Sequence, residues 1–363
     1  MMGGTEEKIK DIEEELKKTQ YNKATEHHVG KLKAKLSKLQ MDLESQRKGG
    51  GEGFSIPKTG DATVSLIGFP NVGKSSLLNV LTDANSEVAN FSFTTLRPVP
   101  GTMEYKGAQI QVVDLPGIIE NASAGAGRGR EILSVARNSD LILVITDIKT
   151  SGLSKIVNEL YKVGIVLNRT RKNISMKKKG SGGIKVYSPR GMNIDHEAVR
   201  DILKEFKIAN ADLYIRQNIT SDDLIEYLRS GTVYIPALLV VNKIDLDPDF
   251  VLPPDSQISD FRMLKVSAQT GAGISDLKEQ IFVSLDLIRV YLREKSGEVD
   301  MERPLVLSSG STVRDVARKI SREMISSFRY AIVSGPKRKF RELRVGLEYE
   351  LLDEDIVTVV SRN

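Results

Sequence analysis

The stretch GFPNVGKS, from Gly68 to Ser75, has the pattern G-x-x-x-x-G-K-S. Its glycines let the backbone turn tightly and point N–H groups at a pyrophosphate. The lysine offers a positive charge to the outer phosphates, and the serine hydroxyl is a ligand for Mg²⁺. We therefore predict a phosphate-binding loop, whose contacts are expected from Gly68, Asn71, Val72, Gly73, Lys74, Ser75 and Ser76.

A second motif, DLPG, begins at Asp114 at the end of an apolar run. A carboxylate there is expected to hold Mg²⁺ together with Ser75, and the Gly117 N–H to contact the γ-phosphate. Between the two motifs, NFSFTTLRP offers Thr95, with Thr94 beside it. Thr95 is expected to be a third Mg²⁺ ligand, which would order its loop only in the triphosphate state.

Two later motifs select a base. In NKID, Asp245 can accept hydrogen bonds from N1–H and N2–H₂ of guanine, which adenine cannot offer in that arrangement. Asn242 is expected to tie its loop to the phosphate loop, and Lys243 to lie over the purine face. In SAQTG, which begins at Ser267, the Ala268 N–H is expected to serve guanine O6. Together the four motifs predict guanine nucleotide binding.

These motifs need a sheet to position them. Apolar runs predict strands over 63–67, 99–105, 109–113, 141–146, 237–241 and 263–266, with helices over 75–81 and 274–295. Strands that alternate with helices imply a parallel α/β sheet with right-handed crossovers. Each motif follows a strand, and the carboxyl edge of an open α/β sheet is where such folds hold ligands.

The segment between the strands at 141 and 237 is too long for one crossover, even with a helix over 154–163. We predict an inserted subdomain over 166–232. Its elements are a hairpin of 173–176 with 184–187, a helix from Asp195, a strand near Leu213 and a helix over 221–228.

The two ends of the chain differ in composition from this middle. Residues 5–48 predict two helices with a break at 21–24, which form either a solvated arm or a docking pair. Residues 49–60 have the composition of a linker. After 301, strands over 305–307, 330–333, 344–345 and 356–360 and a helix over 313–324 predict a small sheet crossed by one helix.

Composition excludes several classes of protein. The 363 residues contain no Cys, which rules out a disulfide scaffold, a zinc finger and a cysteine nucleophile, and fits a reducing compartment. No run of 18 apolar residues exists, so no membrane span is expected. The 53 Lys and Arg against 48 Asp and Glu permit a nucleic-acid partner without establishing one.

The motifs resemble those of the developmentally regulated GTP-binding protein (DRG) family, in the Obg-like branch of translation-factor-class GTPases. GFPNVGKSSLLN, FSFTTLRPVPG, DLPGIIENASAGAGRGRE, NKID and VGLEYELLDEDIVTVV carry the resemblance, which covers essentially the whole chain. It implies an N-terminal helical domain with its linker over 1–60, a P-loop GTPase domain over 61–297 and a C-terminal β-grasp (TGS) domain over 298–363. It further implies a cytoplasmic protein that binds GTP and GDP and associates with ribosomes or RNA rather than DNA. In eukaryotic members of the family a partner protein stabilises the GTPase, which makes a stabilising partner protein a candidate here. The absence of Cys and the compact C-terminus fit an archaeal source.

Catalysis needs a positioned water and neutralised phosphate charge. The residue after DLPG is Ile118, where many GTPases place a glutamine, and an apolar side chain cannot orient water. The resemblance implies that Asn71 coordinates K⁺, which would take the electrostatic place of an arginine finger. Slow hydrolysis stimulated by K⁺ is expected. The glycine-rich segment with Gly125, Gly127 and Gly129 is expected to be a mobile switch beside Ile118.

Basic residues near the C-terminus suit an RNA backbone. The candidates for RNA contacts are Arg314, Arg318, Arg322, Lys337, Arg338 and Lys339. The lysine tip at 177–179 of the insertion is a further candidate. Aromatic residues are not interleaved with these, so base stacking is not expected. The alternative function is a nucleotide or stress-signal sensor, in which the C-terminal domain binds a small regulator.

Overall fold

The computed structural model describes residues 3–20, 25–46, 59–82, 99–115, 134–149, 152–229, 231–251, 259–293, 297–339 and 341–361. The chain divides into a first unit, Met1–Gly53 with Val157–Tyr234, and a second unit, Phe54–Ile156 with Ile235–Asn363. None of the helices in these ranges is long and apolar enough to cross a membrane.

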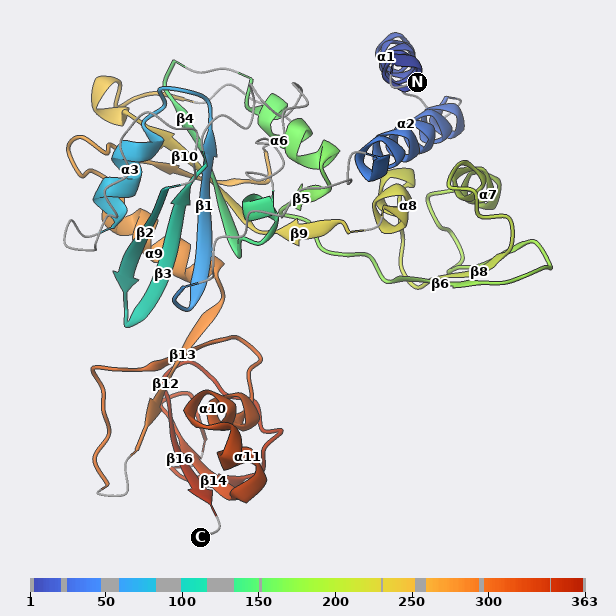
Figure 1. Ribbon diagram of the computed structural model, residues 1–363. Coiled ribbons are helices and arrows are strands. Elements are labelled where there is room, and N and C mark those ends of the chain that lie inside the picture. Colours follow the sequence, from blue (N-terminus) through green and yellow to red (C-terminus); the bar gives the residue numbers. More distant parts are fainter. Residues whose placement is uncertain are drawn as a thin grey trace. The chain divides into compact units, whose positions relative to one another are not determined.

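The second unit contains a six-stranded sheet in the order β11-β10-β4-β1-β3-β2 (Figure 1). All neighbours are parallel except β2 and β3, which are antiparallel. The strands are β1 (Ala62–Gly68), β2 (Val99–Tyr105), β3 (Ala108–Asp114), β4 (Leu141–Asp147), β10 (Ala237–Asn242) and β11 (Arg262–Lys265). The predicted α/β sheet is confirmed, and β4 and β10 are buried along their whole length because helices cover both faces of such a sheet.

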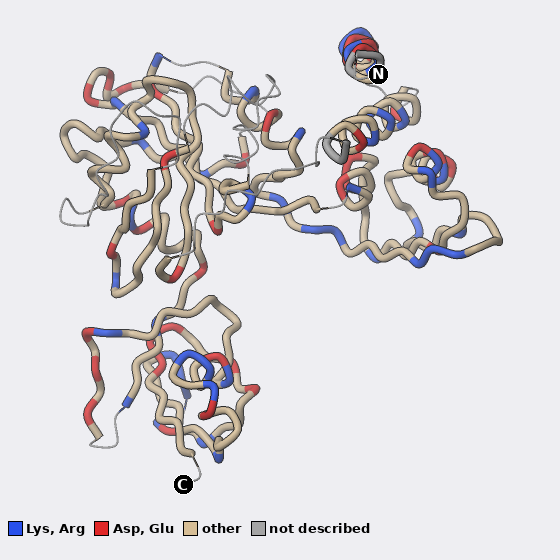
Figure 2. Tube along the Cα trace, viewed as in Figure 1, with Lys and Arg blue, Asp and Glu red and all other residues tan. Residues whose placement is uncertain are grey.

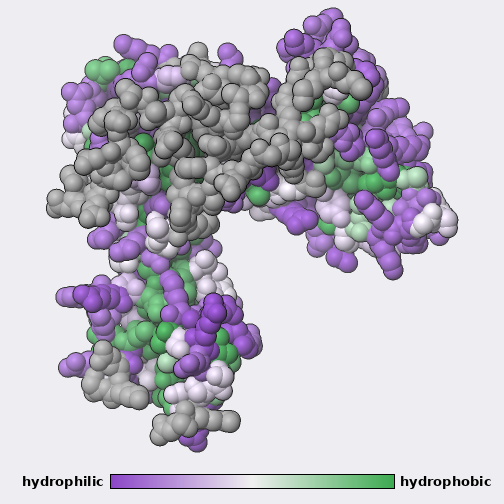
Figure 3. Space-filling view, in the orientation of Figure 1, coloured by the Kyte–Doolittle hydropathy of each residue, from purple (hydrophilic) through white to green (hydrophobic). Residues whose placement is uncertain are grey.

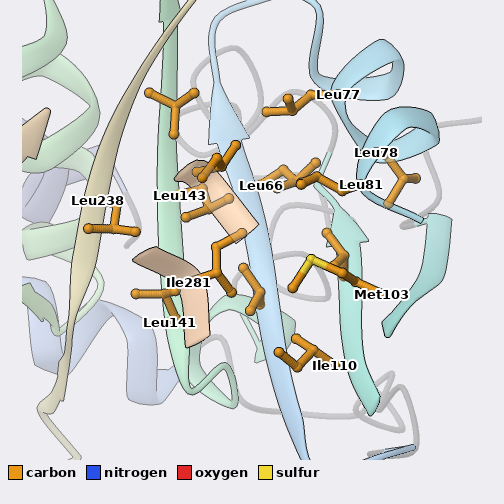
Figure 4. Packing of buried hydrophobic residues seen from close by; sticks show 14 of the residues in the cluster. Leu66, Leu77, Leu78, Leu81, Met103, Ile110, Leu141, Leu143, Leu238 and Ile281 are labelled. Atoms are coloured by element: carbon orange, nitrogen blue, oxygen red, sulfur yellow. The ribbon is translucent and has the colours of Figure 1, made fainter. Parts of the chain in front are cut away.

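Helices α3 (Lys74–Leu81) and α9 (Ile274–Ser284) share one core with this sheet. Figure 4 shows Leu77 and Leu81 of α3 beside Leu66 and Met103 of the strands. The long helix predicted over 274–295 is wrong, because α9 ends at Ser284 and the chain re-enters a sheet as β12 (Leu287–Leu292). Buried and half-buried side chains alternate at the start of β12, as in a strand with one covered face.

The C-terminal sheet of the second unit has five strands in the order β13-β12-β16-β14-β15. They are β12, β13 (Leu305–Ser308), β14 (Phe328–Ser334), β15 (Leu343–Val345) and β16 (Asp355–Ser361). The sheet thus begins at Leu287, ahead of the boundary expected between 297 and 298. On the visible face of this domain, hydrophobic residues emerge between hydrophilic ones (Figure 3), since so small a domain cannot cover all its apolar side chains.

The single helix predicted over 313–324 is wrong. The structure has α10 (Val313–Ile320) and a separate α11 (Arg322–Ser327). Ser321 between them is extended, with φ −161°, and its hydroxyl accepts a hydrogen bond from the Glu323 N–H. A serine that caps a new helix in this way ends the preceding one, so Arg322 lies on a different helix from Arg314 and Arg318.

The first unit joins two segments that lie far apart in the sequence. From the N-terminal segment come α1 (Gly3–Lys18) and α2 (Glu26–Gln46). The later segment, Val157–Tyr234, contains the insertion and the short elements that flank it. Its elements are the end of α6 (Leu153–Lys162), β5 (Ile165–Leu167), β6 (Ile174–Lys178), β7 (Ile184–Tyr187), α7 (His196–Glu205), β8 (Ala211–Ile215), α8 (Ser221–Leu228) and most of β9 (Val233–Ile235). The helices predicted from Asp195 and over 221–228 are confirmed, with Asp195 and Thr220 as their N-caps.

The predicted hairpin of β6 with β7 is wrong. Their sheet has the order β6-β8-β7, with β8 antiparallel to β6 and parallel to β7. Ala211, Leu213 and Ile215 of β8 are buried in the core beneath α7 and α8, so the most apolar strand takes the central position. β8 comes later in the chain and lies between β6 and β7 in the sheet. The alternation of apolar and polar residues within each strand does not reveal such an order.

Helix α2 packs on α7 and α8 of the insertion. Ala34 of α2 is fully buried in the core of the inserted subdomain. A Cβ on Gly30 would lie 3.0 Å from Ser221 Oγ, so the missing side chain allows the helices to approach closely. Lys33 Nζ pairs with both carboxylate oxygens of Asp222 at 2.9 Å. Helix α2 therefore docks on this chain's own insertion, and α1 packs on α2.

We expect Ala34→Asp to free α2 from the insertion, because it buries a charge without a partner, at a cost of about 3–5 kcal/mol. Hydrogen exchange of the α2 amides measures this as faster opening. Lys35→Asp is the control, since Lys35 is exposed one position along the same helix. Equal protection of α2 in the two variants would contradict the docking.

Candidate functional site

The predicted phosphate loop lies between β1 and α3. The structure explains why two of its positions are occupied by glycine. Gly73 is the N-cap of α3 with φ 89°, a left-handed conformation that side chains rarely adopt. A Cβ there would also lie 2.4 Å from Asn242 Nδ2. A Cβ on Gly68 would lie 2.3 Å from the Ile145 carbonyl oxygen of β4. Both positions thus require glycine for reasons of space.

Lys74 is the first residue of α3 and is 9% exposed. Its ammonium spans the loop, donating to the carbonyl oxygens of Gly68 at 3.2 Å and Phe69 at 2.9 Å. Val72 is fully buried beneath the loop. Asn71 and Ser76 are exposed, and Asn71 has a left-handed backbone with φ 62°. The loop therefore brings backbone N–H groups, a helix N-terminus and a lysine together, and this combination forms an anion-binding site.

Ser75, in the first turn of α3, meets Asp114, the last residue of β3. Ser75 Oγ donates to Asp114 Oδ2 at 2.7 Å. Asp114 Oδ1 is buried without a hydrogen-bond partner among the residues that the structure describes. Burial raises the pKa of Asp114, while the Ser75 hydrogen bond and the nearby Lys74 charge act in the opposite direction. These oxygens are the donors that Mg²⁺ prefers, and a cation there would satisfy the unpartnered oxygen.

Asn242, the last residue of β10, connects three loops. Its Nδ2 donates to the Val72 carbonyl oxygen at 2.9 Å, and its Oδ1 accepts from the Ala268 N–H at 3.0 Å. Lys243, with φ 63°, donates through Nζ to the Asn71 carbonyl oxygen at 2.6 Å. The phosphate loop, the NKID loop and the SAQTG loop are thus held together by two neighbouring side chains.

Asp245 and Ser267 also lie together. Ser267 Oγ donates to Asp245 Oδ1 at 2.5 Å and accepts from the Thr270 N–H at 3.1 Å. Ser267 is fully buried, whereas Asp245 is exposed. Because the buried Ser267 hydroxyl holds Oδ1 of Asp245, the orientation of the carboxylate is fixed and its Oδ2 points in a defined direction. A fixed carboxylate of this kind can recognise two neighbouring N–H donors of a ligand.

Asp147 belongs to this site, although the sequence patterns did not point to it. It ends β4, is 6% exposed, and its Oδ2 lies 2.8 Å from Lys243 Nζ. The available signal was a carboxylate directly after LILVIT, at the same edge of the sheet as Asp114. Asp147 positions Lys243 beside the phosphate loop.

Several predicted residues lie outside the described ranges. They are Thr94, Thr95, Gly117, Ile118, Gly125, Gly127 and Gly129.

The basic residues near the C-terminus are not equivalent. Arg338 is largely covered and pairs with the fully buried Asp355 at 2.5 Å, so it stabilises its own domain. Arg314 pairs with Glu348, and Arg318 with Asp315 at 3.0 Å. Arg322, Lys337 and Lys339 are exposed. The six candidates therefore do not form one continuous basic face.

Models of known families match most of this chain. The family model described as a 50S ribosome-binding GTPase matches residues 63–178, and the model for the C-terminal region of that domain matches 181–287. The TGS domain model matches 288–361. A crystal structure of a GTP-binding protein from Pyrococcus horikoshii is similar at TM-score 0.42 and 17% identity, covering 83% of this chain and all of that one.

Relatives are similar over nearly their full length. A GTP-binding protein of Methanocaldococcus jannaschii is 47% identical, covering 99% of this chain and 93% of its own. Developmentally-regulated GTP-binding protein 1 of Xenopus laevis is 43% identical over 99% of this chain and 100% of its own. Developmentally-regulated G-protein 3 of Arabidopsis thaliana is 43% identical over 98% of both. The chain therefore belongs to the developmentally regulated GTP-binding protein family, and it is a GTP-hydrolysing enzyme with a P-loop GTPase domain and a C-terminal TGS domain.

Proposed function

We propose that the chain is a nucleotide-dependent switch that binds ribosomes or RNA in its GTP state and hydrolyses GTP slowly. The observation that carries the nucleotide site is the junction at Asn242, which connects the phosphate loop to both base-recognition loops. In this proposal the phosphates bind Lys74 and the loop N–H groups. Ser75 and Asp114 hold Mg²⁺, which offsets phosphate charge, and outside the described ranges Thr95 and Gly117 contact the metal and the γ-phosphate.

The guanine base is proposed to bind between Lys243 and Asp245. Asp245 accepts from the base with the oxygen that Ser267 leaves available. The Ala268 N–H already donates to Asn242, so its contact with guanine O6 would be a shared hydrogen bond. Because Asp245 is exposed at the rim, the base can enter without unfolding the loops.

We expect Asp245→Asn to weaken GDP binding by roughly 10- to 100-fold, since a charged hydrogen bond contributes about 1.5–3 kcal/mol. Xanthine has a carbonyl where guanine has N2–H₂, so the variant should bind xanthosine diphosphate better than GDP. Titration calorimetry with both nucleotides measures this. Asp247→Asn, exposed in the same turn, is the matched control and should keep the wild-type preference.

Potassium is proposed to assist hydrolysis at Asn71. This residue is exposed at the rim of the phosphate loop, and it offers a side-chain oxygen of the kind that binds alkali cations. Ile118 cannot orient a water, so this residue does not supply the usual catalytic contact. The resemblance implies that a cation near the phosphates stabilises the charge that develops on them.

GTP hydrolysis is expected to be faster in KCl than in NaCl at equal ionic strength, and Asn71→Ala should remove the difference. Phosphate release under single-turnover conditions provides the rates, with GDP affinity as a check that the variant retains its site. Equal rates of the wild type in the two salts would rule out the role of K⁺.

The ribosome is the proposed partner because the matching family model is described as a 50S ribosome-binding GTPase. Exposed Arg322, Lys337 and Lys339 would contribute phosphate contacts. The sensor alternative has less support. A hollow on the C-terminal domain contains Arg318 and Lys319, but these pair with Asp315 and Asp61 at 3.0 Å, so their charges are already used within the protein.

Ribosome co-sedimentation with a non-hydrolysable GTP analogue and with GDP, in K⁺ buffer at low and moderate salt, tests the switch. We expect binding only with the analogue, and none for Lys74→Ala. Binding that ignores the nucleotide and disappears with salt would reduce the interaction to general electrostatics. No binding in any condition would contradict the ribosomal role.

A further inference from the structure

The sheet β6-β8-β7 of the first unit has one face that its helices do not use. On one face, Leu213 and Ile215 of β8 pack into the core with α7 and α8. Side chains alternate along a strand, so Asp212 and Tyr214 lie on the other face. The register places Lys177 of β6 and Lys185 of β7 beside Asp212 on that face.

Two tyrosines stack on this outer face. The rings of Tyr187 and Tyr214 have centroids 4.8 Å apart and planes within 9° of parallel. They are neighbours because β7 and β8 pair in parallel with Tyr187 opposite Tyr214. They are 46% and 38% exposed, so their area is not used for packing a core. The sequence pattern did not point to this pair, because the two tyrosines meet only through the register of β7 with β8.

The surroundings of the tyrosines are basic. Residues 169–190, which include β6 and β7, contain eight Lys and Arg and no Asp or Glu. Figure 2 shows Lys and Arg along the strands of this sheet. The carboxylate of Asp212 is 8% exposed and pairs with Lys179, which neutralises it. An anionic partner would therefore meet paired aromatic rings with a row of lysines beside them.

We propose that this face, formed by Tyr187, Tyr214, Lys177 and Lys185, binds single-stranded RNA. Unpaired bases would stack on the tyrosine rings, and the phosphates between them would lie against the two lysines. A duplex keeps its base faces covered and so cannot use the rings. The inference rests on the RNA-binding role proposed above and assigns it a site in the insertion, separate from the C-terminal domain.

The test uses the full chain and a fluorescent 12-nucleotide single-stranded RNA, with binding followed by anisotropy. Replacing both tyrosines by leucine (Tyr187→Leu with Tyr214→Leu) keeps apolar bulk on the strands but removes the stacking rings. We expect this double variant to bind roughly tenfold more weakly or worse, since each stacked base contributes about 1–3 kcal/mol. The matching double phenylalanine variant keeps the rings and should bind like the wild type.

Charge and ligand controls separate stacking from general attraction. Lys185→Ala should weaken binding, whereas Lys35→Ala, an equal change of charge at an exposed position of α2, should not. Duplex RNA should bind weakly and respond little to the leucine changes. Single-stranded DNA of the same sequence shows whether the 2′-hydroxyl adds affinity to the shared stacking chemistry.

The outcomes distinguish this site from the broader proposal. If the double leucine variant binds RNA like the wild type while Lys337→Ala with Lys339→Ala binds weakly, RNA binding stands and this face is not its site. If the wild type binds no single-stranded RNA, both this site and the broader proposal that the chain binds RNA are contradicted. If the leucine variant keeps RNA but loses ribosomes, the face contacts ribosomal protein, and the inference is overturned.

Discussion

The side-chain amide of Asn242 is the contact on which the nucleotide site depends. It donates to the carbonyl of Val72 and accepts from the N–H of Ala268, so one residue fixes loops that follow three different strands. Gly73 leaves the space that the amide occupies. The motifs of the sequence are therefore mechanically coupled: a change in the phosphate loop reaches the base-recognition loops through the hydrogen bonds of Asn242 and of its neighbour Lys243.

The insertion does not disturb the loops of the nucleotide site, because the chain leaves the sheet after β4 and returns to it at the neighbouring strand β10. β4 and β10 pair in parallel although a whole subdomain separates them in sequence. The short strands β5 and β9 pair where the insertion departs and returns, and Arg229 donates to the Tyr161 carbonyl oxygen at 2.9 Å beside them. Since the ends of the insertion are already close, its length adds little to the entropy of closing the sheet.

Local patterns predicted most of the sheet and the four motifs, because apolar runs and glycine spacing are properties of neighbouring residues. Apart from the helix break at Ser321, the failures have one physical origin, which is pairing between distant parts of the chain. LIRVYL of β12 has a pattern that suits a helix or a strand, and only its pairing with β13 and β16 decides. β8 separates β6 from β7 by a long-range pairing. Tyr187 and Tyr214 are 27 positions apart and meet only through parallel register. Asp147 likewise needed the sheet order before it could be placed beside Lys243.

The docking of α2 on the insertion also sets an order of events during synthesis. Lys33 and Asp222 are 189 residues apart. At about 5–20 residues per second, the N-terminal helices emerge roughly 10–40 s before the surface that covers them. During that interval the face that contains Gly30 and Ala34 has no native partner. The first unit therefore starts to be synthesised before the second but can fold completely only after α7 and α8 have been made. Until then, the apolar face of α2 in the nascent chain must be covered by other contacts.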